Sequence, residues 1–386
     1  MQRTVSCLWE EPLARKKYRA AVSVHGHTNH SKESLYFIAE FAGKHPLLRW
    51  ALAGQERRAR DISAITVDFS KAYWTPPVTP LAAYRLEKDQ IENQLGLASM
   101  VSLTDHDNIE APTFLRVMPE TQQIPVSIEW TVPFRDIDIH IGLHNLPAVK
   151  AAGIVADLND FTQRPDENRL GELLCLMHEN PDVLVVLNHP LWDMAGVGKP
   201  RHISSLNVFV AKYGMFLHAF ELGGLRNWEE NREVVRFAEG WNTPIIAGGD
   251  RHGSEPSAVV NLTQAESFAE FIHEVRKEQR THLLFMPQYA EPHVLRLLQT
   301  LLDVIREYPE YPAGSRRWDE RVFHPDRDQI IRPLSALWKR PEPFIEVMFA
   351  IFRLLEIHPI RSAMQVALGR PEHQMRFEIA DGKVAP

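Results

Sequence analysis

The stretch Ala21-Val22-Ser23-Val24-His25-Gly26-His27-Thr28 contains an apolar run that ends in two histidines separated by one residue. In a β-strand, the side chains of residues i and i+2 point to the same face. We therefore expect a buried strand over residues 18–25, with His25 and His27 directed toward one point where the strand ends. Such a pair is found in metal sites and also at the ends of ordinary strands, so its meaning depends on the rest of the chain.

The same arrangement recurs along the sequence. Apolar runs over residues 99–103, 183–187 and 244–248 also end in acidic or imidazole side chains. The residues at these ends are Asp105, His106, His189, Asp250 and His252. Two more predicted strands, over 124–130 and 135–143, add Glu129 and His140. We expect these side chains to meet at one rim, because the carboxyl ends of parallel strands lie on the same side of a sheet or barrel.

Segments with helical periodicity alternate with the predicted strands. They cover residues 81–94, 166–179, 203–213, 228–240 and 264–279. Alternation of strand and helix with short connections is typical of parallel βαβ units and an α/β fold. About seven such units, with polar residues gathered at the strand ends, favour a (β/α) barrel over an open sheet, and active sites of such barrels lie at that end.

The pattern changes near residue 291. We expect the barrel to occupy residues 1–290 and a helical appendage to occupy 291–386, with helices at 291–305, 329–338 and 342–356 and no strand. This appendage is expected to pack on the barrel or to form a homo-oligomer contact.

Composition limits the classes of function. The chain has 386 residues, of which 44% are hydrophobic, and a net charge of −7, which does not favour a broad nucleic-acid-binding surface. Cys7 and Cys175 stand in unrelated contexts, so a reducing compartment is expected. The N-terminus lacks the apolar core of a signal peptide and no apolar run is long enough to span a membrane. We expect a cytoplasmic protein with no membrane partner.

Imidazole and carboxylate ligands suit manganese, iron and zinc. The rim residues outnumber the ligands that one ion needs, so we expect two or three divalent ions, with Glu129 able to bridge two of them. Such a cluster activates water and neutralises the oxygens of a phosphoryl group. Without a metal, burying these groups would cost several kcal/mol each.

Six short motifs follow one another in a familiar order. They are His25-Gly26-His27-Thr28, Thr104-Asp105-His106-Asp107, Glu129, Ile139-His140-Ile141-Gly142, Asn188-His189-Pro190 and Gly249-Asp250-Arg251-His252. Over residues 18–290 the sequence resembles the PHP (polymerase and histidinol phosphatase) family. The resemblance implies a distorted (β/α)7 TIM-like barrel, a trinuclear site of manganese, iron or zinc, and phosphoesterase activity.

The resemblance also implies roles for individual residues. The implied metal ligands are His25, His27, His106, Glu129, His140, His189, Asp250 and His252. Asp105 takes a role behind the ligands or in proton transfer. Arg251, inside the last motif, is our choice for the residue that holds the phosphate.

The sequence departs from the family pattern after the first histidine pair. A further ligand is usual there, but Lys32 stands at its register position, which leaves His30, Glu33 or Asp68 as alternatives. Residues 31–76 look inserted, and we expect them to cover the site and to set substrate choice.

Other readings stay open at single positions. His144 is an alternative to His140. Glu221 suits either an acid behind the ligands or a salt bridge, and Trp192 suits either a stacking surface for a base or sugar or a packed rim aromatic.

Three functions follow from these features. The leading interpretation is a metal-dependent phosphoesterase acting on a small phosphorylated substrate. The alternatives are a nuclease acting on nucleic-acid ends and a non-catalytic, metal-bound structural module.

Overall fold

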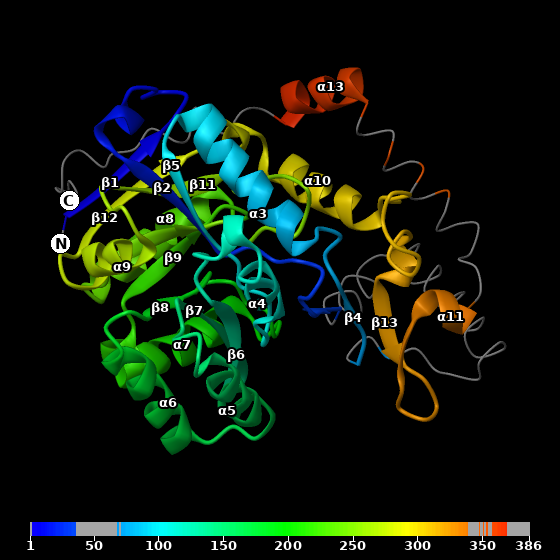
Figure 1. Ribbon diagram of the computed structural model, residues 1–386, viewed down its shortest axis with the longest axis horizontal. Coiled ribbons are helices and arrows are strands. Elements are labelled where there is room, and N and C mark those ends of the chain that lie inside the picture. Colours follow the sequence, from blue (N-terminus) through cyan, green and yellow to red (C-terminus); the bar gives the residue numbers. More distant parts are fainter. Residues whose placement is uncertain are drawn as a thin grey trace.

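The computed structural model describes residues 2–35, 68, 71–338, 347, 350, 353 and 357–368. These residues form a mixed α/β structure in which helices surround two five-stranded sheets, with a smaller four-stranded sheet to one side (Figure 1). The predicted α/β class is confirmed. Most of the predicted helix over 342–356 and most of the predicted cover over 31–76 lie outside the described residues.

The first five-stranded sheet contains the strand that ends in the histidine pair. Its order is β1 (Gln2–Cys7), β12 (Arg280–Phe285), β11 (Val259–Thr263), β2 (Ala20–Val24) and β5 (Ala98–Ser102). All five residues of β2 are buried, as expected of a short apolar strand that is covered on both faces. Strands β1 and β11 were not predicted from the sequence.

The second five-stranded sheet carries the other motifs. Its order is β10 (Ile245–Gly248), β9 (Ala219–Gly223), β8 (Leu184–Leu187), β7 (Ile137–His144) and β6 (Ile128–Phe134). The pairs β10–β9 and β9–β8 are parallel, but β8–β7 and β7–β6 are antiparallel. The expectation of purely parallel pairing is therefore wrong here. The short turn at Arg135, between β6 and β7, can only connect antiparallel neighbours.

The two sheets come together at the ends of their strands. One isolated parallel bridge joins Gly26, after β2, to Arg251, after β10, and another joins His106, after β5, to Glu129 in β6. The described strands do not form one continuous closed ladder.

Several of the described helices pack against strands of these sheets. Their bounds are α3 (Pro80–Asp89), α4 (Glu110–Leu115), α5 (Ala151–Gln163), α6 (Glu167–Glu179), α7 (Lys199–Tyr213), α8 (Trp228–Gly240), α9 (Phe268–Arg276), α10 (His293–Ile305), α11 (Leu334–Trp338) and α13 (His358–Leu368). Side-chain caps fix several starts: Thr79 caps α3, Asp166 caps α6 and Asn227 caps α8.

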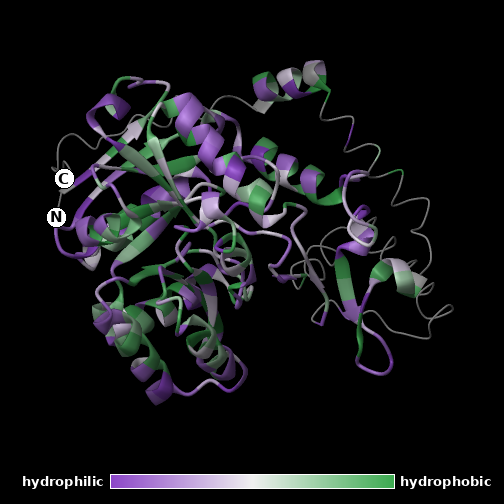
Figure 2. Ribbon diagram, in the orientation of Figure 1, coloured by the Kyte–Doolittle hydropathy of each residue, from purple (hydrophilic) through white to green (hydrophobic). Residues whose placement is uncertain are grey.

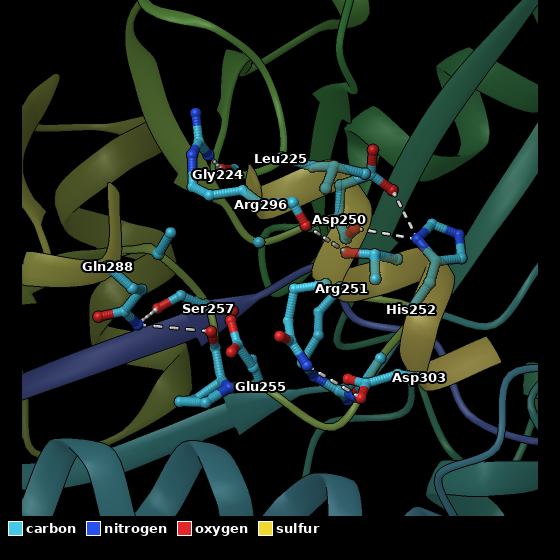
Figure 3. A pocket seen from close by; sticks show the side chains of 16 residues that line it. Gly224, Leu225, Asp250, Arg251, His252, Glu255, Ser257, Gln288, Arg296 and Asp303 are labelled. Carbon is cyan, nitrogen blue, oxygen red and sulfur yellow. Dashed lines mark hydrogen bonds and ion pairs between the residues drawn. The ribbon is translucent and has the colours of Figure 1, made fainter. Parts of the chain in front are cut away.

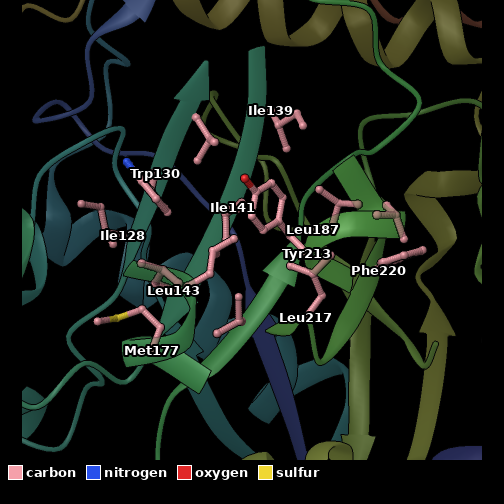
Figure 4. Packing of buried hydrophobic residues seen from close by; sticks show 14 of the residues in the cluster. Ile128, Trp130, Ile139, Ile141, Leu143, Met177, Leu187, Tyr213, Leu217 and Phe220 are labelled. Atoms are coloured by element: carbon pink, nitrogen blue, oxygen red, sulfur yellow. The ribbon is translucent and has the colours of Figure 1, made fainter. Parts of the chain in front are cut away.

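The largest hydrophobic core lies between the second sheet and its helices. Trp130, Ile141 and Phe220 are fully buried in it (Figure 4), in one cluster with side chains from α5, α6, α7 and α8. Hydrophobic residues accordingly concentrate on the strands, whereas a surface helix such as α3 is mostly hydrophilic (Figure 2). This rigid core supports the strand ends on which the motifs lie.

The small sheet joins two distant parts of the chain. Its order is β14 (Ile331–Pro333), β13 (Val322–Pro325), β4 (Tyr73–Trp74) and β3 (Glu33–Ser34), with all neighbours antiparallel. The expectation of no strand after residue 291 is therefore wrong, because β13 pairs with an N-terminal strand that local sequence does not reveal. The division into domains at residue 290 stays a prediction.

None of the described helices combines the length and the apolarity needed to cross a lipid bilayer.

His218, just before β9, provides a test of the fold that is independent of the motifs. Its Nδ1 accepts a hydrogen bond from the Val185 amide at 2.9 Å, and burial, aided by the Arg276 charge, lowers the pKa of His218 from its ordinary 6.5 to about 3. In acid the unfolded chain takes up a proton at this residue and the folded chain does not. Stability from this group is therefore present above about pH 6.5 and is lost as the pH falls.

We expect the variant His218→Asn, whose side-chain oxygen can still accept from Val185, to have a flatter pH profile. Between about pH 6 and pH 4, the free energy of unfolding of the wild type should fall more steeply than that of the variant, by up to about 1.4 kcal/mol per pH unit. Urea unfolding at several pH values measures this slope. Parallel profiles for the two proteins would contradict the burial argument.

Candidate metal centre

The carboxylate of Glu129, near the start of β6, lies at the centre of the histidine cluster. The residue is fully buried. Its Oε1 lies 3.1 Å from His25 Nε2, 3.2 Å from His140 Nδ1 and 3.1 Å from His189 Nε2. Its Oε2 lies 3.3 Å from His27 Nε2 and 3.3 Å from His106 Nδ1. One carboxylate therefore contacts imidazoles from four separate motifs.

Asp250 and Glu33 extend the cluster on either side. Asp250 Oδ1 lies 3.7 Å from His25 Nε2, 3.6 Å from His27 Nε2 and 3.6 Å from His252 Nδ1. Glu33 Oε2 lies 3.2 Å from His106 Nε2 and 3.1 Å from His252 Nε2. The three carboxylates thus alternate with imidazoles through one buried volume.

These side chains form four overlapping groups with the spacing of metal ligands. The groups are His27–Glu33–His106–His252, His25–His27–Glu129, His25–His189–Asp250 and His106–Glu129–His140. All eight ligands that the PHP resemblance implies belong to at least one group, together with Glu33.

Backbone geometry at the strand ends directs several of these side chains inward. His25, Asp250 and His189 have positive φ angles of 65°, 47° and 26°. A left-handed backbone costs a residue with a side chain about 1 kcal/mol or more. The surrounding core keeps these conformations in place, since His25 and Asp250 are each nearly fully buried.

Glu221, on β9, orients the first histidine. Its Oε2 lies 2.6 Å from His25 Nδ1, which leaves His25 Nε2 to face Glu129. A carboxylate on the far nitrogen fixes the tautomer and the ring orientation of a metal-binding histidine. Gly248, on the neighbouring strand β10, makes this contact possible, because a Cβ at that position would overlap the Glu221 carboxylate. Of the two readings of Glu221, the structure therefore places it behind the ligands.

Arg226, after β9, orients Asp250 in a similar way. Its guanidinium donates to Asp250 Oδ2 at 2.7 Å, so that Oδ1 faces the histidines. The guanidinium also stacks over the Trp192 ring, 3.8 Å from the ring centroid. Trp192 in turn contacts His189 edge-on and is partly exposed. Trp192 is thus a rim aromatic with one face covered by Arg226.

Asp105 lies next to the cluster but belongs to none of its groups. Its two oxygens accept hydrogen bonds from the Thr28 amide at 2.6 Å and from the Thr28 hydroxyl at 2.7 Å. Burial raises the pKa of Asp105 to about 6. Because both oxygens hold Thr28, the geometry gives Asp105 a role in fixing the loop after His27. The alternative role in proton transfer stays a prediction.

Arg251 is not directed into the cluster. Its Nε donates to Glu87 at 3.1 Å and its Nη1 donates to the Gly253 carbonyl at 2.8 Å. Figure 3 shows Arg251 in the wall of a pocket that Asp303 and Arg296 also line. Glu87 pairs with the buried guanidinium of Arg251, so the assignment of Arg251 to phosphate binding stays a prediction.

The charges of the cluster favour cation binding. Burial alone would raise the pKa of Glu129, but the imidazoles of His25, His140 and His106 hold it well below its usual range. Burial disfavours a charge on His25, yet Glu129 and Glu221 raise its pKa well above 6.5. His189 behaves in the opposite way, because burial lowers its pKa to about 3. The surrounding imidazoles therefore favour the ionised form of the Glu129 carboxylate.

The donor set fits divalent metal ions. His25 Nε2, His27 Nε2, Glu33 Oε1 and Glu129 Oε2 are buried and have no hydrogen-bond partner among the described residues. Buried polar atoms are nearly always satisfied, and orphaned atoms that converge on one volume require a partner. Neutral imidazole and ionised carboxylate are the ligands of zinc, manganese and iron.

The structure distinguishes between the alternatives for the extra ligand. Glu33 joins the cluster from β3, whereas His30 pairs with Glu110 at 2.7 Å near the surface. Asp68 pairs with Lys71 and belongs to no group. Lys32, at the register position, extends over the Tyr73 ring.

Of the two neighbouring histidines on β7, His140 belongs to a group and His144 does not. His144 lies deeper, with its Nδ1 2.8 Å from the Ser102 hydroxyl.

Arg226 and Asn188 are the site residues that sequence reasoning gave no role. Asn188 donates to Glu129 Oε1 at 2.9 Å. A signal was present for Arg226: Gly223-Gly224 ends β9 just as Gly248-Gly249 ends β10 ahead of Asp250. In both cases two consecutive glycines at the end of an apolar strand precede a residue of the cluster region.

Comparisons with known proteins give no closer assignment. No protein-family model matches the sequence, and no curated protein matches it. Among solved structures, the chain is similar to a proposed metal-dependent phosphoesterase from Bifidobacterium adolescentis (12% identity, TM-score 0.31, covering 51% of this chain and 91% of that chain). It is also similar to PsfC from Pseudomonas syringae (13%, TM-score 0.38, 74% and 98%). A third similar structure is an amidohydrolase from Chromobacterium violaceum with bound sulfate and no metal (13%, TM-score 0.29, 46% and 83%). At these TM-scores the similarities carry no conclusion, so the PHP resemblance rests on the motifs alone.

The contact between Gly248 and Glu221 yields a test of the centre. We expect Gly248→Ala to displace the Glu221 carboxylate from His25 and to weaken metal binding by about 10- to 100-fold, the usual effect of losing a partner behind a ligand. Chelator competition followed by metal analysis measures the change.

Gly153→Ala on α5 is the matched control, because nothing lies within 4 Å of the added methyl group. This variant should bind metal as the wild type does. Equal affinities for the wild type and Gly248→Ala would show that Glu221 does not support His25.

Proposed function

We propose that this chain is a metal-dependent phosphoesterase that hydrolyses a small phosphorylated substrate. The observation that carries the proposal is the buried Glu129 carboxylate, which is shared by two of the four donor groups. A carboxylate shared in this way is suited to bridging two cations, and closely spaced cations are typical of sites that cleave phosphate esters.

We also propose that the described strands form a distorted (β/α)7 barrel of the PHP type. The order of the six motifs supports this proposal, as do the two isolated bridges at Gly26–Arg251 and His106–Glu129. Those bridges join the ends of β2 and β10 and of β5 and β6. Taken with the regular ladders, these two bridges support a ring of seven strands in the order β2, β5, β6, β7, β8, β9, β10.

The residues of the centre would hold two or three divalent cations, with manganese, iron and zinc as the candidates. When bound, these ions supply Lewis-acid chemistry, lowering the pKa of a water molecule and neutralising charge on a phosphoryl group. His25, His189 and Asp250 would form one end of the centre, and His27, Glu33, His106 and His252 the other.

The protein's own contribution is positioning. Glu221 and Arg226 fix the orientation of His25 and Asp250 before any ligand arrives, so little reorganisation accompanies the reaction. Asp105 holds Thr28 and thereby the loop that carries His27. Trp192 and Arg226 stack on each other at the rim, and Arg226 also pairs with Asp250.

The proposal is tested with protein reconstituted with Mn²⁺, Fe²⁺ or Zn²⁺. We expect hydrolysis of p-nitrophenyl phosphate or mononucleotides, and no comparable cleavage of an end-labelled oligonucleotide. Preferential cleavage of the oligonucleotide would favour the nuclease alternative. Full metal content without any phosphatase or nuclease activity would favour the structural module.

Two single variants test the residues. His27→Ala and Asp250→Ala each remove donors from the groups, and we expect both to lose metal and to reduce kcat/KM at least about 100-fold, which exceeds the usual loss for a residue behind the ligands. Metal content, activity and circular dichroism are measured on the same preparations, and the fold should be retained.

His273→Ala is the matched control, since this histidine lies on α9 with an exposed side chain that pairs with Glu278. Its metal content and activity should equal those of the wild type. Unchanged metal content in Asp250→Ala would remove the basis of the proposal.

A further inference from the structure

The residues of the candidate centre are supported by two different parts of the fold. His25, His189 and Asp250 lie one or two residues after the ends of β2, β8 and β10 of the five-stranded sheets, where the large cores lie. Glu33 instead lies on the two-residue strand β3 at the edge of the small sheet. Two residues of strand have little stability of their own, so the position of Glu33 depends on its neighbours.

Those neighbours lead to the C-terminal part of the chain. In the small sheet, Glu33 pairs with Trp74 on β4, and Trp74 pairs with Val322 on β13. In the next residue pair of the same two strands, Tyr73 of β4 stacks on Phe323 of β13, with ring centroids 5.2 Å apart. Strand β4 is therefore held between the strand that carries Glu33 and a strand almost 250 residues later in the sequence.

A separate hydrophobic cluster holds these strands together. It consists of Leu35, Ala72, Val322, Leu334 and Leu337, with Trp74 and Trp318 packed against it. Leu35 is only two residues beyond Glu33 and is buried against the C-terminal side chains. The apolar contact that fixes β3 therefore comes from residues 318–338, which we call the C-terminal clamp.

Further bonds tie the clamp to the same region. The Thr75 amide donates to the Arg321 carbonyl at 2.9 Å, and the Asp68 amide donates to His324 Nε2 at 2.9 Å. Trp74 also contacts the centre itself, since its ring lies 5.8 Å from the ring of His252, another member of the Glu33 group. The clamp thus reaches the cluster through Trp74 and through Glu33.

We propose that the C-terminal clamp positions Glu33 in the metal centre and so sets the affinity for the cation held by His27, Glu33, His106 and His252. This inference rests on the proposed function, because it requires a cation at that group. In the other groups the five-stranded sheets fix the positions of the donor side chains, so cation binding there should not depend on the clamp. Leu334 and Phe323 are positioning residues in this scheme, since neither belongs to the cluster of donors.

The test is the metal content of full-length variants under increasing chelator concentration. We expect Leu334→Ala, which empties part of the hydrophobic cluster, to weaken one metal equivalent by about 10- to 100-fold and to leave the others within about two-fold of wild type. Glu33→Gln should weaken the same equivalent. Leu334→Met, which preserves volume, should restore wild-type binding.

Leu295→Ala is the matched control, because Leu295 on α10 is as buried as Leu334 and lies outside the hydrophobic cluster. It should keep every metal equivalent. A loss in this variant equal to that in Leu334→Ala would overturn the inference, since general destabilisation would then explain both. If Leu334→Ala does not fold, as judged by near-UV circular dichroism, Phe323→Ala is measured instead, because it removes the half-buried ring that stacks on Tyr73 in the same strand pair.

The outcomes separate the two proposals. Loss of one equivalent in Glu33→Gln but not in Leu334→Ala or Phe323→Ala would overturn the role of the clamp and leave the metal centre standing. Unchanged binding in Glu33→Gln would overturn both the clamp and the proposed ligation by Glu33. Parallel loss in Glu33→Gln and the clamp variants, with Leu295→Ala unaffected, supports the inference.

Discussion

The buried negative charge of Glu129 is the constraint around which the rest of the structure is arranged. Moving an ionised carboxylate out of water is costly unless positive or hydrogen-bonding partners surround it. Imidazoles from four motifs and the amide of Asn188 provide those partners. Because the partners come from β2, β5, β7 and β8, satisfying one charge requires both five-stranded sheets to be in register.

The remaining charges are balanced around this centre in pairs. Glu221 stands behind His25 and Arg226 stands behind Asp250, so each inner residue has an outer partner of opposite polarity. Without a metal, Glu129 and Glu221 raise the pKa of His25, which favours a positive charge on that imidazole. Metal ligands must give up their protons, so a divalent cation held by this group would take the place of that proton. The arrangement of buried charges favours cation binding more than it stabilises the fold.

Local sequence was sufficient for the parts of the fold that local physics determines. The apolar runs that became β2, β5, β8 and β10 were recognised because they are short, buried and followed by polar residues. The same regularity gave the eight ligands implied by the motifs. Strands β1 and β11 were missed because no polar motif follows them in the sequence. The antiparallel turn at Arg135 was missed because it contains no glycine, the residue that usually indicates such a turn.

The contacts of the site that local sequence does not reveal join residues far apart in the chain. Arg251 lies inside a motif, but its guanidinium donates a hydrogen bond to Glu87, which is 164 positions earlier in the sequence. Glu33 could not be chosen over His30 or Asp68, because its place depends on the pairing of β3 with β4 and of β4 with β13. Sequence patterns report periodicity within an element and contain little about which remote strand completes a sheet.

The pairing of β4 with β13 also has a consequence for synthesis. Ribosomes deliver a chain from its N-terminus, so β3 and β4 emerge long before Val322–Pro325 exists. Throughout that interval β4 presents an open edge bearing Tyr73 and Trp74, which is the kind of surface that recruits another nascent chain. The small sheet can therefore be completed only after residues 322–325 have been translated.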